Sequence, residues 1–241
     1  MKILNKICEK ENDRFGKSSA TIAFLGDSVT QGCFECYITS SGGIETVFDP
    51  DNSFPSLTVK FLHLLYPASQ INLINAGISG DSAPSGFARF ERDIEPYHLD
   101  LVVIGYALND SSRGLEGIAD YTEAMNGICR KSAGLGAECI ILTPNMMNTA
   151  VSCHLTSDTM RSLAQSFAET QVKGVLEKYA EAAVKVAENR GIPVCDMYSR
   201  WKKMSEYGVD VTELLANKLN HPLREMSRVT AMALIETMFN K

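Results

Sequence analysis

A serine that could act as a nucleophile follows the first apolar run of the chain. The tripeptide Gly26-Asp27-Ser28 comes directly after Thr21 to Leu25, a run typical of a buried strand. Ligands of α/β proteins bind outside the carboxyl ends of such strands. A serine hydroxyl becomes a nucleophile only when a base takes its proton and donors stabilise an oxyanion. Ser28 therefore indicates acyl chemistry only if a histidine and suitable donors reach the same edge.

The other groups that such a site needs occur later in the chain. Gly77 follows the apolar run Ile71 to Ile74, and Asn109 follows the run Leu101 to Ile104. A glycine N–H and an asparagine amide are suitable donors to an oxyanion. His221 stands on a loop before the last helical pattern and offers an imidazole as base. The carboxyl ends of parallel strands share one edge of a sheet, so we expect these groups to meet there.

In the order of Ser28, Gly77, Asn109 and His221, the sequence resembles the GDSL esterases and lipases, also called SGNH hydrolases after these four residues. The resemblance implies that Ser28 is the nucleophile and His221 the base. It implies that Gly77 and Asn109 complete the oxyanion hole with the N–H of Ser28. It also implies a three-layer α/β/α flavodoxin-like fold and a serine esterase that uses no metal and no organic cofactor. Ala107 replaces a glycine that is usual in the family, which we expect to tighten local packing.

The acid that commonly orients the histidine in this family is missing. Lys218 stands three residues before His221, where an aspartate is usual. A main-chain carbonyl can also accept the Nδ1 proton and hold the ring. We therefore favour a Ser-His dyad oriented by a carbonyl near Asn217 or Lys218. The alternatives are a carboxylate, Asp210 or Glu213, or an asparagine side chain.

Several other motifs are weaker candidates for chemistry. His154, on the loop after the fourth strand, is the rival base, whereas His63 and His98 are expected to be structural. A second Gly-Asp-Ser at residues 80–82 lies several residues beyond its strand. The pattern Cys33–Cys36 is a C-x-x-C without the second pair that a zinc site needs, so we expect ordinary thiols.

The elements that must position these residues alternate between strand and helix along the whole chain. This alternation is typical of a parallel sheet covered by helices. The five strand candidates are Thr21–Leu25, Ile71–Ile74, Leu101–Ile104, Glu138–Leu142 and Pro193–Cys195. Helical patterns cover residues 54–65, 160–189 with an interruption at Gly174, and 223–239. We expect one domain over residues 1–241, in which residues 1–19 are an N-terminal extension.

Composition excludes several other classes of protein. The chain has 241 residues, of which 45% are hydrophobic and 22% charged, as in soluble globular proteins. A net charge of −6 disfavours nucleic acid as a partner. No apolar run approaches the ~18 residues of a membrane span, and the N-terminus lacks the apolar segment of a secretion signal. We therefore expect a cytoplasmic location, no membrane partner and reduced thiols at the seven scattered cysteines.

The loop after Ser28 suggests the kind of ester. Residues 33–52 mix Phe34, Tyr37 and Phe48 with serines, threonines and glycines. Such a surface suits a sugar or another polar alcohol, and we expect a small-molecule ester with a short acyl group such as acetyl. Acyl transfer or thioester cleavage would use the same groups. A non-catalytic binding protein is a further alternative, supported only by Lys218, and the sequence leaves oligomerisation open.

Overall fold

A parallel sheet forms the centre of the molecule. The computed structural model describes residues 1–240, and within them the sheet has the strand order β4-β1-β5-β6-β7. Its strands are β1 (Ala20–Gly26), β4 (Ile71–Gly77), β5 (Leu101–Gly105), β6 (Glu138–Leu142) and β7 (Val194–Cys195). All neighbouring strands pair in parallel. The five strands taken in chain order lie as 2-1-3-4-5, so the predicted flavodoxin-like sheet is confirmed.

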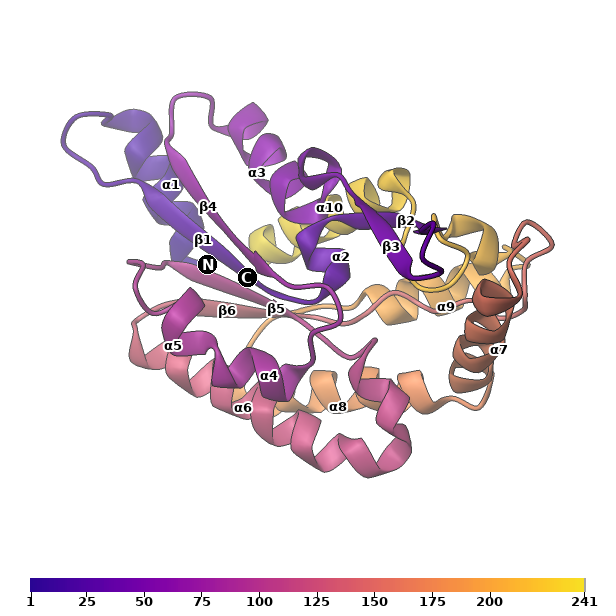
Figure 1. Cartoon of the computed structure of the whole chain (residues 1–241). Coiled ribbons are helices and arrows are strands. Elements are labelled where there is room, and N and C mark those ends of the chain that lie inside the picture. The colour runs from indigo at the N-terminus through magenta and orange to yellow at the C-terminus, as the bar shows by residue number, and fades with distance from the viewer. Residues whose placement is uncertain (241) are drawn as a thin grey trace.

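Helices cover both faces of this sheet and complete three layers (Figure 1). One face carries α3 (Phe54–Leu65) and α10 (Arg224–Phe239), and the other carries α4 (Ala83–Ala88), α6 (Ile118–Gly134) and α8 (Val175–Arg190). Further helices are α1 (Lys2–Asn12), α2 (Ser28–Gln31), α5 (Phe90–Asp93), α7 (Asp158–Val172) and α9 (Met197–Glu206), with 3₁₀ segments η1 (Pro50–Asn52), η2 (Asp110–Gly117) and η3 (Val211–Leu214). None of the helices within residues 1–240 combines the length and the apolar character needed to cross a membrane.

Local sequence explains where the main elements begin and end. The residues of β5 from Leu101 to Ile104 are all buried, as expected for a strand covered on both faces. The hydroxyl of Ser53 caps α3 by accepting a hydrogen bond from the N–H of Ser56. Gly174 separates α7 from α8 with a φ of 73°, so the predicted interruption of the long helical pattern is confirmed.

The N-terminal segment contains a helix that packs onto the domain. Ile3 and Ile7 of α1 are buried in the same core cluster as the sheet. The amine of Lys6 lies 2.7 Å from the carboxylate of Asp100, just before β5. Part of the predicted N-terminal extension is therefore packed against the amino end of the sheet.

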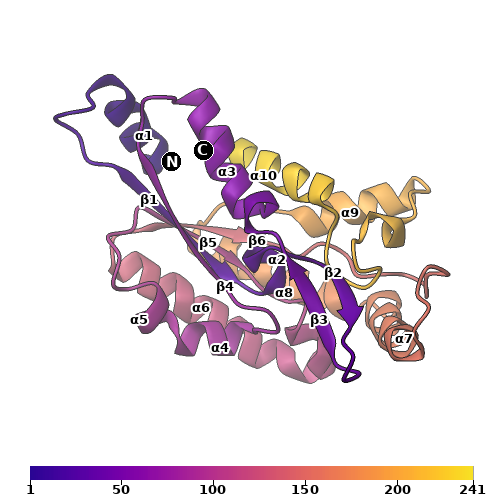
Figure 2. The same cartoon turned by 45° about the horizontal axis from the view of Figure 1, so that its top comes forward.

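A hairpin that the sequence did not reveal follows α2. It consists of β2 (Cys33–Ile38) and β3 (Ile44–Phe48), which pair antiparallel and lie apart from the five-stranded sheet (Figure 2). Most of β3 is exposed, so its sequence lacks the alternation that marks a half-buried strand. In β2 the register shifts between Cys33, which faces Phe48, and Cys36, which faces Thr46. Two residues therefore face one, which is a β-bulge.

The sheet order places the loops after β1 and β5 at one crevice. β1 lies between β4 and β5, and the direction of strand order reverses there. Ligands of open α/β sheets bind at this kind of reversal. The loops that carry Ser28 and Asn109 leave the sheet from these neighbouring strands.

Candidate active site

Ser28 is held at the first turn of α2, just beyond the end of β1. The Asp27 side chain accepts a hydrogen bond from the N–H of Val29 at 3.0 Å and caps the helix. The Oγ of Ser28 lies 3.0 Å from Nε2 of His221. As the first helical residue, Ser28 also has a backbone N–H without an intrahelical acceptor. The turn thus presents both a hydroxyl and a free donor.

His221 is buried, and both of its ring nitrogens have partners. Nδ1 lies 2.9 Å from the carbonyl oxygen of Phe34, and Nε2 faces the hydroxyl of Ser28. A carbonyl oxygen can only accept, so Nδ1 carries the proton and Nε2 is free to accept the proton of Ser28. Burial lowers the pKa of His221 below its ordinary value, and the hydrogen bond to Phe34 opposes part of this effect. The ring is therefore a neutral base at pH 7.

The group that orients His221 is a carbonyl, but not one near Asn217 or Lys218. It belongs to Phe34 in β2, almost two hundred residues away in sequence. Lys218 has a left-handed φ of 59° and directs its amine to the carboxylate of Glu213 at 2.7 Å. The prediction of a carbonyl near Asn217 or Lys218 is thus wrong, because the hairpin brings the carbonyl of Phe34, which is distant in sequence, to the ring.

The two carboxylates considered as substitute acids are engaged elsewhere. Asp210 accepts from the N–H of Thr212 at 2.9 Å and caps η3. Glu213 pairs with Lys218, which lowers the pKa of Glu213. Neither therefore serves Nδ1 of His221 in this structure.

Asn217 holds the main chain that carries His221. Its Oδ1 accepts hydrogen bonds from the N–H groups of Leu219, Asn220 and His221, each at 3.0 Å. Its Nδ2 donates to Oδ1 of Asn220 at 3.0 Å. A single buried side chain thus ties four residues into one turn, so the imidazole enters the site from a rigid loop.

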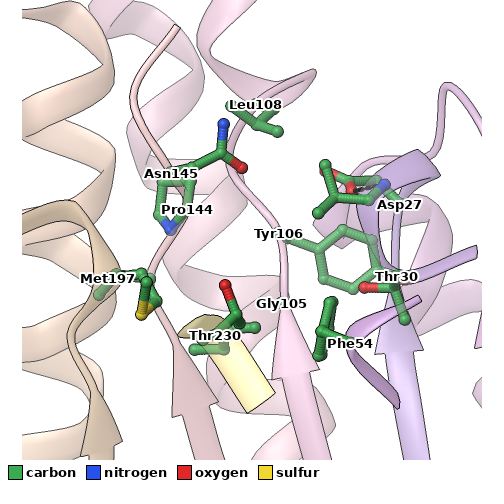
Figure 3. Close-up of a pocket in the computed structure, with 13 residues that line it drawn as sticks. Asp27, Thr30, Phe54, Gly105, Tyr106, Leu108, Pro144, Asn145, Met197 and Thr230 are labelled. Carbon is green, nitrogen blue, oxygen red and sulfur yellow. Dashed lines mark hydrogen bonds between the residues drawn. The ribbon is translucent and has the colours of Figure 1, made fainter. Parts of the chain in front are cut away.

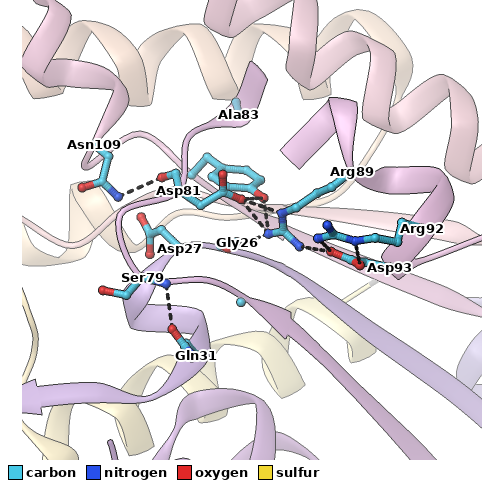
Figure 4. Close-up of polar contacts among 12 residues, drawn as sticks. Gly26, Asp27, Gln31, Ser79, Asp81, Ala83, Arg89, Arg92, Asp93 and Asn109 are labelled. Carbon is cyan, nitrogen blue, oxygen red and sulfur yellow. Dashed lines mark hydrogen bonds and ion pairs between the residues drawn. The ribbon is translucent and has the colours of Figure 1, made fainter. Parts of the chain in front are cut away.

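Asn109 contacts the segment after β4 (Figure 4). Nδ2 of Asn109 donates to the carbonyl of Asp81 at 2.8 Å, and this leaves its second amide hydrogen for another acceptor. The N–H of Ser79 donates to Oε1 of Gln31 at 2.7 Å. Because Gln31 belongs to the same short helix as Ser28, the segment is tied both to α2 and to Asn109.

Gly77 does not offer the donor that the sequence suggested. Its N–H already donates to Oδ1 of Asn75 at 3.0 Å. A Cβ on Gly77 would lie 2.3 Å from the N of Gln31, so this glycine allows the close approach of β4 to α2. Gly80 has a φ of 80° and open space around it, and its N–H has no hydrogen-bond partner among residues 1–240. The free glycine N–H of this segment is therefore that of Gly80, between Ser79 and Asp81.

A buried arginine, which the sequence did not reveal, fixes the segment that carries Gly80. Nε of Arg89 lies 2.8 Å from Oδ2 of Asp81 (Figure 4). Its Nη2 donates to the carbonyl of Gly26 at 3.1 Å and to the hydroxyl of Tyr106 at 3.0 Å. Tyr106 in turn donates to Asp81 at 3.0 Å. This network joins the ends of β1 and β5 to the residues beside Gly80.

Two further carboxyl groups are buried below the site. Burial, with smaller contributions from neighbouring carboxylates, raises the pKa of Asp27 to about 7. Burial also raises the pKa of Asp110 to about 6. Both carboxyl groups therefore keep their protons to a higher pH than an exposed aspartate does.

Ala107 has a backbone conformation that favours glycine. Its φ is 125°, while its N–H donates to Oδ2 of Asp110 at 3.1 Å. The other oxygen of Asp110 accepts from the N–H of Ala83 at 2.9 Å. A non-glycine residue in such a region costs roughly 1–3 kcal/mol. Ala107 thus places backbone strain in the loop that carries Asn109, and its expected effect on packing stays a prediction.

A small cavity lies at the carboxyl ends of β1, β5 and β6 (Figure 3). Its volume is about 30 Å³, and its walls include Val29 and Leu108, the chain neighbours of Ser28 and Asn109. Asn145 lies at its rim and donates to the carbonyl of Asn220 at 2.9 Å, next to His221. Ser28, Asn109 and His221 themselves do not line this cavity.

The weaker candidates make no contact with the Ser28 hydroxyl, although Cys33 lies near Gln31 of the same short helix. His154 is exposed, and its Nε2 is 3.9 Å from the carboxylate of Glu213. Cys33 is buried and Cys36 is partly exposed, and both are free thiols. Within residues 1–240, no group of three or more His, Cys, Asp or Glu side chains is arranged to hold a metal ion.

Comparison with protein-family models gives a match over residues 24–229 to the GDSL-like Lipase/Acylhydrolase family. No curated protein sequence matches the chain significantly. The matched range contains Ser28, Asn109 and His221.

Solved structures share the fold at low sequence identity. A two-domain esterase active on acetylated mannans matches with a TM-score of 0.68 and 19% identity, over 99% of this chain and 52% of that one. This chain thus spans about half the length of that esterase. An acetylxylan esterase from Geobacillus stearothermophilus matches with a TM-score of 0.67 and 18% identity, over 92% of this chain and 95% of that one. A lipase/acylhydrolase from Enterococcus faecalis matches with a TM-score of 0.66 and 19% identity, over 91% of this chain and 95% of that one.

Proposed function

Because the chain belongs to the GDSL-like lipase/acylhydrolase family, a family of carboxylic ester hydrolases, we propose that it cleaves its ester through an acyl-serine intermediate at Ser28. The observation that carries this proposal is the chain of contacts from Ser28 Oγ to His221 Nε2 at 3.0 Å and from His221 Nδ1 to Phe34 O at 2.9 Å. It supplies an acceptor for the serine proton and an acceptor that fixes the tautomer.

The first half of the reaction acylates Ser28. Oγ of Ser28 attacks the ester carbonyl carbon while its proton passes to Nε2 of His221. The carbonyl oxygen becomes an oxyanion that accepts from the N–H of Ser28, the free amide hydrogen of Asn109 and the N–H of Gly80 in place of Gly77. When the tetrahedral intermediate collapses, the bond to the alcohol oxygen breaks. His221 then returns its proton to that oxygen, and the alcohol leaves.

The second half hydrolyses the acyl-serine. A water molecule gives a proton to Nε2 of His221 and attacks the acyl carbonyl carbon, which forms the same oxyanion again. Collapse breaks the bond to Oγ of Ser28, which regains a proton from His221, and the carboxylic acid is released. The sequence of steps consumes one ester and one water and leaves the protein unchanged.

We infer that the substrate is a short acyl ester, such as acetyl, of a sugar or another polar alcohol. Tyr37 and Phe48 of the hairpin are about half exposed, and this supports contact with a sugar face. The structural neighbours named as active on acetylated mannans and as an acetylxylan esterase also support this substrate class.

A panel of esters tests this proposal directly. We expect hydrolysis of p-nitrophenyl acetate and of acetylated xylo- or manno-oligosaccharides, and little or none of p-nitrophenyl palmitate or acyl-CoA. The Ser28→Ala variant is the blank for each substrate. Preference for the palmitoyl ester would contradict the short acyl group. Turnover confined to acyl-CoA, or rates that depend on an added alcohol acceptor, would instead support thioester cleavage or acyl transfer. Binding of an acetylated sugar without turnover of any member would indicate a binding protein.

Asn109→Ala is expected to lower kcat by about 10² to 10³, the usual cost of one oxyanion donor. KM should change little, because the interaction strengthens only as charge develops on the ester oxygen. Asn72→Ala is the matched control, since its amide donates to Thr21 at the far end of the sheet. Steady-state kinetics with p-nitrophenyl acetate checks this, and an effect confined to KM would make Asn109 a residue of substrate binding.

The pH dependence of kcat/KM should have its acid limb below the ordinary pKa of histidine, about 6.5. Burial lowers the pKa of His221, and only the neutral ring accepts the serine proton. Activity should therefore rise with pH through this lowered pKa and then level off. The Asp27→Asn variant should show the same midpoint, which separates His221 from the buried carboxyl. A midpoint at or above about 6.5 in both proteins would contradict a desolvated imidazole base.

A further inference from the structure

The carbonyl that orients His221 belongs to a hairpin that the central sheet does not hold. β2 pairs only with β3, and neither strand pairs with the five-stranded sheet. Phe34 lies in the bulge of β2, where Phe34 and Glu35 together face the single residue Val47. A bulge turns a carbonyl away from the strand ladder. The distance from this carbonyl to Nδ1 therefore depends on whatever fixes the hairpin.

Arg224, from the segment that follows His221, contacts strand β2 and the residue directly after β3. It is the first residue of α10 and stands three positions after the histidine. Its guanidinium donates to both carboxylate oxygens of Glu35, at 2.6 and 3.2 Å. Its Nε donates to Asp49, directly after β3, at 2.7 Å. The guanidinium carbon Cζ of Arg224 also lies 4.3 Å from the centroid of the Phe34 ring.

These contacts use the geometry of arginine rather than its charge alone. An isolated surface ion pair contributes little to stability, but a bidentate pair within a network of several charges is the exception. The three side chains are only partly exposed, and Arg224 lowers the pKa of Glu35 and of Asp49. A lysine cannot pair with two carboxylates in a fork and also stack on a ring. The cluster of Arg224, Glu35 and Asp49 thus joins α10 to the bulge of β2 and to the residue that follows β3.

We propose that Arg224 is a positioning residue for catalysis, which acts through the bulge of β2. It holds the carbonyl of Phe34 against Nδ1 of His221 and so keeps the ring in the tautomer and orientation that accept the proton of Ser28. The carboxylates of Glu35 and Asp49 serve this purpose by binding Arg224, without touching the imidazole. The inference rests on the proposed function, since it concerns the base of that reaction.

Substitution of Arg224 tests the role from the side of α10. We expect Arg224→Met to lower kcat by about 10- to 100-fold, the size of effect that a displacement near 1 Å produces. KM for p-nitrophenyl acetate should stay within about twofold, because Arg224 acts on the hairpin and not on the bound ester. Arg224→Lys should recover only part of the loss. Arg200→Met is the matched control, because Arg200 of α9 makes an exposed ion pair with Glu236 of α10, and the kcat of this variant should not change.

A spectroscopic readout separates positioning from general destabilisation. In ¹⁵N-edited NMR spectra, the wild-type ring of His221 should carry its proton on Nδ1, and Arg224→Met should raise the share of the Nε2-protonated tautomer. If Arg224→Met unfolds near room temperature, Glu35→Gln takes its place, because it removes the charge on the hairpin that binds Arg224. In the double variant Arg224→Met with Glu35→Gln, the loss in kcat should be no larger than in Arg224→Met alone, since both act on one contact.

The outcomes distinguish this inference from the proposed function. An unchanged kcat and an unchanged tautomer in Arg224→Met would overturn the positioning role, as would losses that multiply in the double variant. If Ser28→Ala kept its activity, the proposed function would fail, whereas the tautomer measurement would still report whether Arg224 holds the ring. A dead Ser28→Ala together with a fully active Arg224→Met would overturn this inference alone.

Discussion

Ser28→Ala is expected to lower ester hydrolysis by at least about 10⁴-fold, because the variant can form no acyl intermediate. The fold should be unaffected, since the side chain lies beyond the sheet and its main contact is to His221. The helix cap comes from Asp27 and is retained. Steady-state kinetics, with thermal unfolding as a check on folding, measures the effect.

The second Gly-Asp-Ser offers a matched control for this variant. Ser82 precedes α4, but its hydroxyl makes no capping hydrogen bond. Ser82→Ala should therefore keep nearly full activity. Mass spectrometry of the wild-type protein quenched during turnover should find the acyl group on the peptide that contains Ser28. More than a few per cent of activity in Ser28→Ala, or an acyl group on the other peptide, would remove Ser28 from the role of nucleophile.

His221→Ala should cause a loss of similar size, at least about 10⁴-fold, because no other group lies in position to accept the serine proton. If the Phe34 carbonyl orients the ring, no single carboxylate variant should reproduce this loss. Asp210→Asn and Glu213→Gln should stay within about tenfold of the wild type. Lys218→Asp should be close to neutral, because Nδ1 already has its acceptor.

The comparison among these variants decides how the base is oriented. All are measured with the same small ester, and circular dichroism checks that each remains folded. A severe loss in Asp210→Asn or Glu213→Gln with the fold intact would show that a carboxylate reaches the ring during turnover. A marked gain in Lys218→Asp would indicate that the carbonyl orients the ring poorly.

The sheet was predictable because its physical signal is local. Leu101 to Ile104 and Glu138 to Leu142 are runs of the length and apolar character that buried parallel strands require. Ser28, Asn109 and His221 were predictable as a group because each follows a strand or precedes the last helix in a familiar order. The structure places Ser28 and His221 in contact, and Asn109 on the neighbouring strand end.

The groups that the sequence missed act through the main chain or through distant contacts. The orienting carbonyl of Phe34 has no side-chain signature, and the strand that holds it lacks the alternation of a half-buried strand. The choice between Gly77 and Gly80 depends on which N–H the turn leaves free, and this follows from the side chain of Asn75. Arg224 became visible only when the hairpin brought Glu35 and Asp49 together.

The use of a carbonyl to orient His221 changes which mutations can damage the site. An aspartate in that position would be lost by one nucleotide change in its codon, whereas every amino acid that replaces Phe34 brings its own carbonyl oxygen to the same place. The orientation of His221 is therefore more sensitive to mutations that change the path of the backbone than to mutations that change the identity of one residue. Insertions or deletions between Cys33 and Cys36 would shift the bulge and withdraw the carbonyl, so length changes in β2 should be far less tolerated than missense changes at Phe34 that preserve the hairpin.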